Sequence, residues 1–79
     1  MPEVTIRYFA AARSAAGEST ATADAASLGD LITTVSVDRP ELARVLSLCT
    51  FLLDGERAVP STPLRAGALV DALPPFAGG

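Results

Sequence analysis

Apolar and polar residues alternate at the start of the chain, where Val4, Ile6 and Tyr8 are separated by polar side chains. A period of two predicts a strand with one buried face. Phe9 falls on the polar side of this alternation. An aromatic residue there is either part of a second buried layer, which is the default, or an exposed contact for a partner.

An alanine-rich segment, residues 10–16, follows the first strand and is closed by Gly17. This pattern predicts a turn of helix that stops at a glycine in the left-handed conformation. Threonine and alanine then alternate within residues 18–24. That alternation predicts a second strand, although alanine is a poor strand former. The two strands are expected to pair like the arms of a hairpin.

Helical spacing of apolar residues follows in two consecutive segments. Ser27, with Asp30 three residues later, matches a capping box at a helix start. The first segment then carries one apolar stripe, made of Leu28, Leu31, Ile32 and Val35. A shorter helix is predicted from Asp38, with Pro40 in its first turn. Its stripe is made of Leu42, Val45, Leu46 and Cys49.

The last part of the chain has the pattern of three strands. An apolar run over residues 50–53 ends in Asp54-Gly55, which is a strong signal for a hairpin turn. The chain returns over residues 56–59 and passes through a loop rich in turn residues. It then forms a last strand over residues 68–73, which a proline ends.

This order of elements predicts an α+β domain with a mixed sheet packed on one main helix plus a short second helix. The first and last strands can then pair in parallel at the centre of the sheet. Such a sheet with one helix across it is the ubiquitin-like β-grasp layout. We therefore expect a β-grasp domain over residues 1–73 and a flexible C-terminal tail over residues 74–79.

The composition narrows the classes of partner. The chain has 79 residues, which suit one domain, and it has a net charge of −3 with a sequence pI of about 4.6. All 6 basic residues are arginines, and there is no lysine or histidine. An acidic chain argues against nucleic acid and anionic membranes as partners, and favours a protein with a basic patch.

The sequence shows no sign of export, membrane insertion or metal binding. No apolar run approaches transmembrane length, and charged residues interrupt the first apolar stretch, unlike in a signal peptide. We therefore expect a cytoplasmic protein. One cysteine, Cys49, is too few for an internal disulfide, an iron–sulfur site or a zinc cluster. Without a histidine or lysine to activate it, Cys49 is predicted to be a core residue and not a nucleophile.

The sequence ends in Gly78-Gly79, and residues 74–77 before it read Pro-Pro-Phe-Ala. Prolines stiffen the base of the tail, whereas glycines have no Cβ and can thread a narrow channel. Extended, residues 74–79 reach about 20 Å. The tail is therefore either a carboxylate delivered into the active site of another protein or a frayed terminus.

Three stretches of the chain together resemble one family. Residues 8–13, Tyr-Phe-Ala-Ala-Ala-Arg, closed by Gly17, are similar to its opening strand and turn. Thr62-Pro63-Leu64, followed by Gly67, resembles the loop before its last strand. Residues 73–79, Leu-Pro-Pro-Phe-Ala-Gly-Gly, resemble its terminal signature. The family is the MoaD/ThiS group of ubiquitin-like sulfur carriers, and the branch resembled is the small subunit of molybdopterin synthase.

The resemblance implies that an E1-like enzyme uses ATP to adenylate the carboxylate of Gly79, which a sulfur donor then converts to a thiocarboxylate. Gly78-Gly79 would enter the large subunit of molybdopterin synthase. There the sulfur would pass to cyclic pyranopterin monophosphate in molybdenum cofactor biosynthesis. The carrier would bind no cofactor itself, and the active site would lie on the large subunit.

The docking positions of the family carry over onto this chain by motif. They are Phe9 and Arg13 in the opening motif, and Leu73, Pro75, Phe76 and Ala77 at the mouth of the interface. Phe76 stands where the family most often has valine, so the partner would need a roomier entrance.

Three other functions fit the same sequence. The chain could carry sulfur for thiamine or cysteine synthesis, although thiamine carriers are typically shorter and lack the two prolines. It could be a ubiquitin-like modifier that joins Gly79 to lysines of other proteins. It could also be a β-grasp interaction domain in which the two glycines are incidental.

Overall fold

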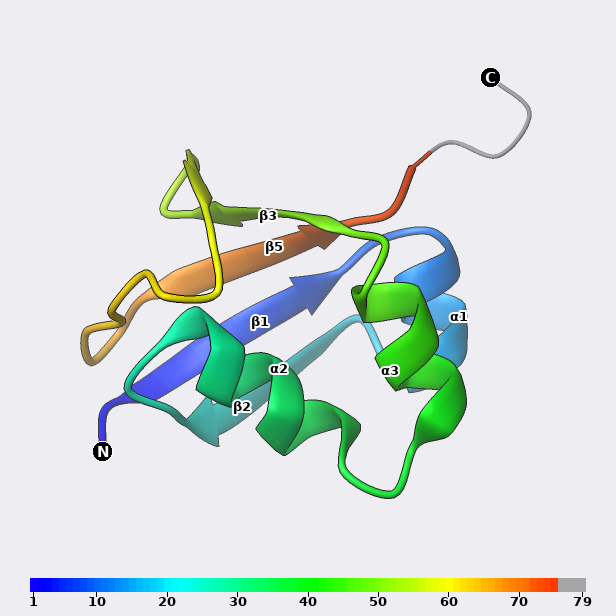
Figure 1. The fold of residues 1–79 in the computed structure, drawn as a ribbon, viewed down its shortest axis with the longest axis horizontal. Coiled ribbons are helices and arrows are strands. Elements are labelled where there is room, and N and C mark those ends of the chain that lie inside the picture. The colour runs from blue at the N-terminus through cyan, green and yellow to red at the C-terminus, as the bar shows by residue number, and fades with distance from the viewer. Residues whose placement is uncertain (76–79) are drawn as a thin grey trace.

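The computed structural model describes residues 1–75, which form a five-stranded sheet and three helices (Figure 1). In chain order the elements are β1 (Glu3–Tyr8), α1 (Ala11–Ala16), β2 (Thr20–Asp24), α2 (Leu28–Ser36), α3 (Pro40–Leu46), β3 (Thr50–Leu53), β4 (Glu56–Ala58) and β5 (Leu69–Leu73). The described part of the chain contains no helix with the length and apolar character that a membrane crossing needs.

The first and last strands lie side by side at the centre of the sheet. The strand order is β2-β1-β5-β3-β4, and β1 runs parallel to β5, with Ile6 opposite Val70. The other neighbouring strands are antiparallel. The predicted pairing of the first strand with the second and the last strand is confirmed, as is the mixed β-grasp sheet.

The three helices cover one face of the sheet. Alternate strand residues are buried beneath them, and Ile6 and Val70 are fully inaccessible to solvent. Every helix contributes to the same apolar cluster, through residues such as Ala12 of α1, Leu31 of α2 and Leu42 of α3. Burial of these matched apolar surfaces is the main source of stability. No helix among residues 1–75 covers the opposite face, where strand side chains are exposed or half-buried.

The turns use the residues that their geometry requires. The Ser27 hydroxyl accepts a hydrogen bond from the Asp30 N–H at 3.2 Å, which confirms the predicted start of α2. Gly17 ends α1 with a φ of 75°, in the left-handed region. Asp54 and Gly55 have φ values of 48° and 90°, which is the backbone conformation of the predicted two-residue hairpin turn.

The second predicted helix has different limits. It begins at Pro40 and not at Asp38, because Asp38 has a φ of 57° and turns the chain before the helix. It ends at Leu46, so Cys49 follows the helix and does not lie on its stripe. Strands β2, β4 and β5 are one or two residues shorter than predicted, because their ends enter turns.

The hydroxyl of Tyr8 generates a prediction about stability. Tyr8 is 2% exposed, and its oxygen has no hydrogen-bond partner among residues 1–75. Tyr8→Phe is expected to keep the fold and to raise the free energy of unfolding by up to about 1 kcal/mol, because it removes an unpaired polar group from the core. Urea denaturation of both proteins measures the difference. A clear loss of stability in the variant would show that the hydroxyl has a partner.

Candidate functional site

The tail leaves the molecule from a central strand. Leu73, the last residue of β5, is half-buried and lies opposite Thr50 of β3. Pro74 follows it and ends the strand, since proline has no N–H for the ladder. Pro75 is exposed. The strand that leads into the tail therefore lies between β1 and β3, and the chain leaves the sheet at the end where α1 lies (Figure 1).

Phe9 lies beside this strand on the uncovered face of the sheet. Its N–H donates to the carbonyl of Ala72 at 3.3 Å, so the backbone of Phe9 extends β1 along β5. Its side chain is 38% exposed. The default expectation of a second buried layer is wrong, because no described helix packs on this side. Phe9 is an exposed aromatic residue, as the alternative reading predicted.

Arg13 belongs to the same end of the molecule. The carbonyl of Phe9 accepts a hydrogen bond from the Ala12 N–H at 3.0 Å, so α1 starts directly after Phe9 and carries Arg13 in its first turn. Arg13 is exposed and forms no ion pair with another described residue. The structure thus brings Phe9, Arg13, Leu73 and Pro75 to one end of the sheet. Four other predicted site residues, Phe76, Ala77, Gly78 and Gly79, lie outside the described residues.

An ion pair that the sequence analysis did not single out lies between the two central strands. The Arg7 guanidinium donates from Nε to Asp71 Oδ1 at 2.6 Å and from Nη2 to Asp71 Oδ2 at 3.0 Å. This hydrogen-bonded carboxylate raises the pKa of the Arg7 side chain above its ordinary value. The predicted parallel pairing was compatible with this contact but did not specify the register, which places Arg7 opposite Asp71.

Three leucines adjoin this ion pair on the uncovered face. Leu52 of β3 lies directly opposite Asp71. Leu69 and Leu73 are two positions before and after Asp71, and therefore point to the same side of β5. All three leucines are half-buried. We call Leu52, Leu69, Leu73 and Phe9 together the open apolar face. This face is continuous with the start of the tail, because Leu73 precedes Pro74.

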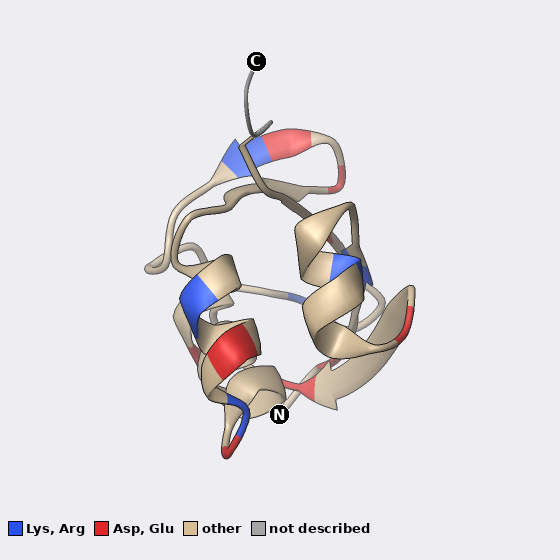
Figure 2. Cartoon of the chain, turned by 90° about the vertical axis from the view of Figure 1, so that its right-hand side faces the viewer, with Lys and Arg blue, Asp and Glu red and all other residues tan. Residues whose placement is uncertain are grey.

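Charged residues are spread over the remaining surface. In the view of Figure 2, acidic and basic positions are interspersed over helices, loops and strands.

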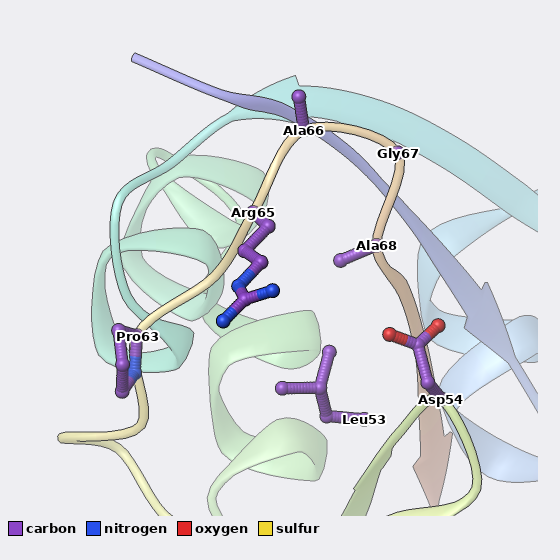
Figure 3. Close-up of a pocket in the computed structure, with 7 residues that line it drawn as sticks. All are labelled: Leu53, Asp54, Pro63, Arg65, Ala66, Gly67 and Ala68. Atoms are coloured by element: carbon purple, nitrogen blue, oxygen red, sulfur yellow. The ribbon is translucent and has the colours of Figure 1, made fainter.

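The hollow drawn in Figure 3 lies away from the tail. Its volume is about 310 Å³, and it is lined by Leu53, Asp54, Pro63, Arg65, Ala66, Gly67 and Ala68. Arg65 extends into it from one side, and the carboxylate of Asp54 lies on the other. The hollow adjoins the start of β5, whereas the tail follows its end, so the two are separated by the length of the strand. It contains no cysteine, histidine or serine side chain.

Cys49 lines a second hollow, of about 320 Å³, between β3, β4 and the end of α3. Its thiol is half-buried and donates to the carbonyl of Val45 at 3.3 Å. Burial raises the pKa of the thiol from 9.0 to about 11. The thiol therefore remains protonated near neutral pH, and the prediction that Cys49 is not a nucleophile agrees with its surroundings.

The chain matches one family model and shares its fold with several solved structures. The model of the ThiS family matches residues 6–79, from the first strand to the two final glycines. No curated protein sequence matches the chain.

Among the solved structures, SAMP1 from Haloferax volcanii has 26% identity and a TM-score of 0.86, and the match covers 98% of this chain and 99% of that one. The small archaeal modifier protein 1 from Methanosarcina acetivorans has 23% identity and a TM-score of 0.89 over 100% and 98% of the two chains, which shows the fold alone. A third structure is the complex of subunits 1 and 2 of molybdopterin-converting factor from Helicobacter pylori 26695. Its matching chain has 26% identity and a TM-score of 0.72 over 98% and 99% of the two chains.

The raised pKa of Cys49 generates a prediction about alkaline pH. The folded state holds the thiol proton more tightly than the unfolded chain does. The contribution of the protonated thiol to the free energy of unfolding is therefore fully present below pH 9.0 and is lost as the pH rises towards about 11. The chain has no lysine and only one tyrosine, Tyr8, whose pKa burial also raises. Urea denaturation at several pH values should show wild type losing stability across this range and Cys49→Ala losing less.

The double variant Tyr8→Phe/Cys49→Ala serves as the control, because it removes both groups that titrate there. Its stability should be nearly constant over the same range. Equal pH dependence of wild type and Cys49→Ala would contradict the assignment to the thiol.

Proposed function

Because the chain belongs to the ThiS family, as its resemblance to the MoaD/ThiS sulfur carriers predicted, we propose that it is the sulfur-carrying small subunit of a molybdopterin synthase. The β-grasp fold is shared by sulfur carriers and by ubiquitin-like modifiers, and the structures it resembles include both. The choice between these functions rests on the tail and on the surface around its base.

The observation that carries the proposal is the way the tail begins. Leu73 and Pro74-Pro75 extend from the centre of the sheet, beside the exposed ring of Phe9. A carboxylate at the end of such a segment can reach a buried site on another protein while the domain stays folded against its surface. The domain supplies position and recognition, and its partners supply the reactive side chains.

The chemistry proceeds in three balanced steps. The carboxylate of Gly79 attacks the α-phosphorus of ATP on the activating enzyme, which forms an acyl adenylate and releases pyrophosphate. Sulfur at the sulfide level from the donor then adds to the acyl carbon and displaces AMP, which leaves a C-terminal thiocarboxylate; if the donor carries a persulfide, its attack gives an acyl disulfide that a thiol reduces to the thiocarboxylate. The thiocarboxylate sulfur finally forms a C–S bond to cyclic pyranopterin monophosphate on the large subunit as a C–O bond of that substrate breaks, and water then cleaves the acyl C–S bond, which returns the carboxylate and leaves the sulfur on the product. A second loaded carrier delivers the other sulfur of the dithiolene. ATP is thus a substrate of the activating enzyme, and the carrier binds no cofactor.

The proposed interface with the large subunit uses the end of the sheet where the tail starts. Phe9 and Leu73 provide exposed or half-buried apolar area next to Pro75, and Arg13 provides a cation on the adjoining helix. Phe76 and Ala77 are proposed for the mouth of the channel. Gly78-Gly79 are proposed to pass through it, since a backbone without Cβ atoms needs the least space. The Helicobacter pylori complex of subunits 1 and 2 supports a partner of this kind.

A ubiquitin-like modifier is the second candidate, favoured by the similarity to SAMP1 from Haloferax volcanii. The same acyl adenylate would then react with a lysine of another protein. The chain itself has no lysine. One copy of such a modifier could therefore not be joined to a lysine side chain of another copy. Carriers for thiamine or cysteine synthesis use the same activation and differ in the acceptor.

The tail provides a direct test of the carrier function. Gly79→Ala, or one residue added after Gly79, is expected to leave thermal unfolding unchanged and to abolish sulfur transfer, because the partner's channel closes around the backbone. The readouts are the mass of the thiocarboxylate and the yield of molybdopterin with purified partners. Cys49→Ala is the matched control, and it should carry sulfur like wild type. Full transfer by either tail variant would exclude the mechanism.

Capture from the cell separates the candidate functions. A tag on the N-terminus leaves Gly79 free, and bound proteins are identified by mass spectrometry. Recovery of the large molybdopterin synthase subunit is the expected result. Recovery of a thiazole or cysteine synthase would show that the chain carries sulfur for another pathway. Gly-Gly remnants on lysines of many proteins would favour the modifier.

A further inference from the structure

The ion pair between Arg7 and Asp71 occupies a central position on the uncovered face of the sheet. The two residues are directly opposite each other in the parallel register of β1 and β5. Two hydrogen bonds join them in a fork, which fixes both side chains. Because its arginine lies at the surface, the pair adds little to stability, and its fixed geometry is available for recognition.

The pair presents its positive half to the outside. The Arg7 side chain is 45% exposed, whereas that of Asp71 is only 15% exposed. A guanidinium has five N–H donors, and Asp71 accepts from only two of its nitrogens, Nε and Nη2. The ring of Phe9 lies 5.7 Å from the guanidinium carbon and supports it from another direction. The remaining donors are therefore held in place before any partner arrives.

The surroundings of the pair are apolar on the side of β5 and β3, whereas Thr20 of β2 lies opposite Arg7 and Arg57 of β4 lies opposite Leu52. Leu52, Leu69 and Leu73 adjoin it along and across the strands. A partner that covers these leucines must also remove water from Arg7. Donors left without acceptors in such a contact would be costly, so the partner has to supply an acceptor at this point. A carboxylate is the strongest such acceptor for a guanidinium.

We propose that the Arg7–Asp71 pair determines which protein binds the open apolar face. Only a partner that covers the leucines and places an aspartate or glutamate against Arg7 binds tightly there. The partner is the protein that receives the tail, because Leu73 of this face leads directly into Pro74-Pro75. The inference rests on the proposed function. The net charge of −3 governs the encounter with a partner at long range, whereas the single carboxylate fixes the register once the surfaces meet.

The test exchanges the two charges. Arg7→Asp/Asp71→Arg keeps a cross-strand pair but turns a carboxylate towards the partner. The probe is the purified large subunit of molybdopterin synthase from the same organism, titrated with each variant by calorimetry. The exchange is expected to weaken binding by at least about ten-fold, because two carboxylates then face each other. Charge reversal of the acidic residue on the large subunit should restore the binding.

The chain offers a matched control in its other ion pair. Glu41 and Arg44 on α3 are joined at 2.6 Å, and both side chains are more than 60% exposed, at 65% and 63%. The exchange Glu41→Arg/Arg44→Glu should change the affinity by less than about two-fold. If thermal unfolding shows that the Arg7→Asp/Asp71→Arg variant does not fold, the binding experiment uses Arg7→Gln/Asp71→Asn instead. That neutral pair keeps hydrogen-bonding groups without charge and should also weaken binding.

The outcomes separate this inference from the proposed function. A folded exchange variant that binds the large subunit as tightly as wild type overturns the specificity role, while wild-type binding itself upholds the proposed function. No binding by wild type overturns both. If sedimentation shows that wild type dimerises and the exchange abolishes only the dimer, the face joins two copies of the chain, and the inference is wrong.

Discussion

Strands β1 and β5 pair in parallel at the centre of the sheet, although they come from the two ends of the described chain. Parallel neighbours need a long connection, and here that connection contains every other strand and helix. β2 extends the sheet from β1, and β3 extends it from β5. The helices then cover the face on which Ile6 and Val70 meet. Without this one pairing, neither the core nor the position of the tail would be defined.

Most of the fold could be predicted because its signals are local. The period of two in β1, the cap at Ser27 and the turn at Asp54-Gly55 each depend on residues close together in the sequence. The placement of Phe9 could not be predicted in this way. Alternation assigned it to the polar side of β1, but whether another layer covers that side depends on distant elements. The limits of α3 were missed because apolar spacing continues past Leu46 into a turn, which brings Cys49 to the edge of the core.

In the candidate site, too, some residues could be predicted from the sequence and others could not. Phe9, Arg13 and Leu73 were found through motifs, and the structure brings them to one end of the sheet. Arg7 and Asp71 were not singled out, because each is an ordinary polar position in its own strand. They are 64 positions apart, and only the register of the parallel pair makes them partners. A slip of one residue would turn one of them towards the core. Sequence periodicity predicts which face a residue occupies, but not its neighbour on that face.

The central position of β5 also has a mechanical consequence. A pull on the tail is transmitted through Pro74 to a strand that is hydrogen-bonded on both sides. Force along β5 acts parallel to both ladders and strains their hydrogen bonds together, whereas an edge strand at a free end can be peeled off one bond at a time. Resistance to such pulling is set by the rate of unfolding and not by equilibrium stability alone. A domain built in this way resists unravelling when force is applied through its last strand.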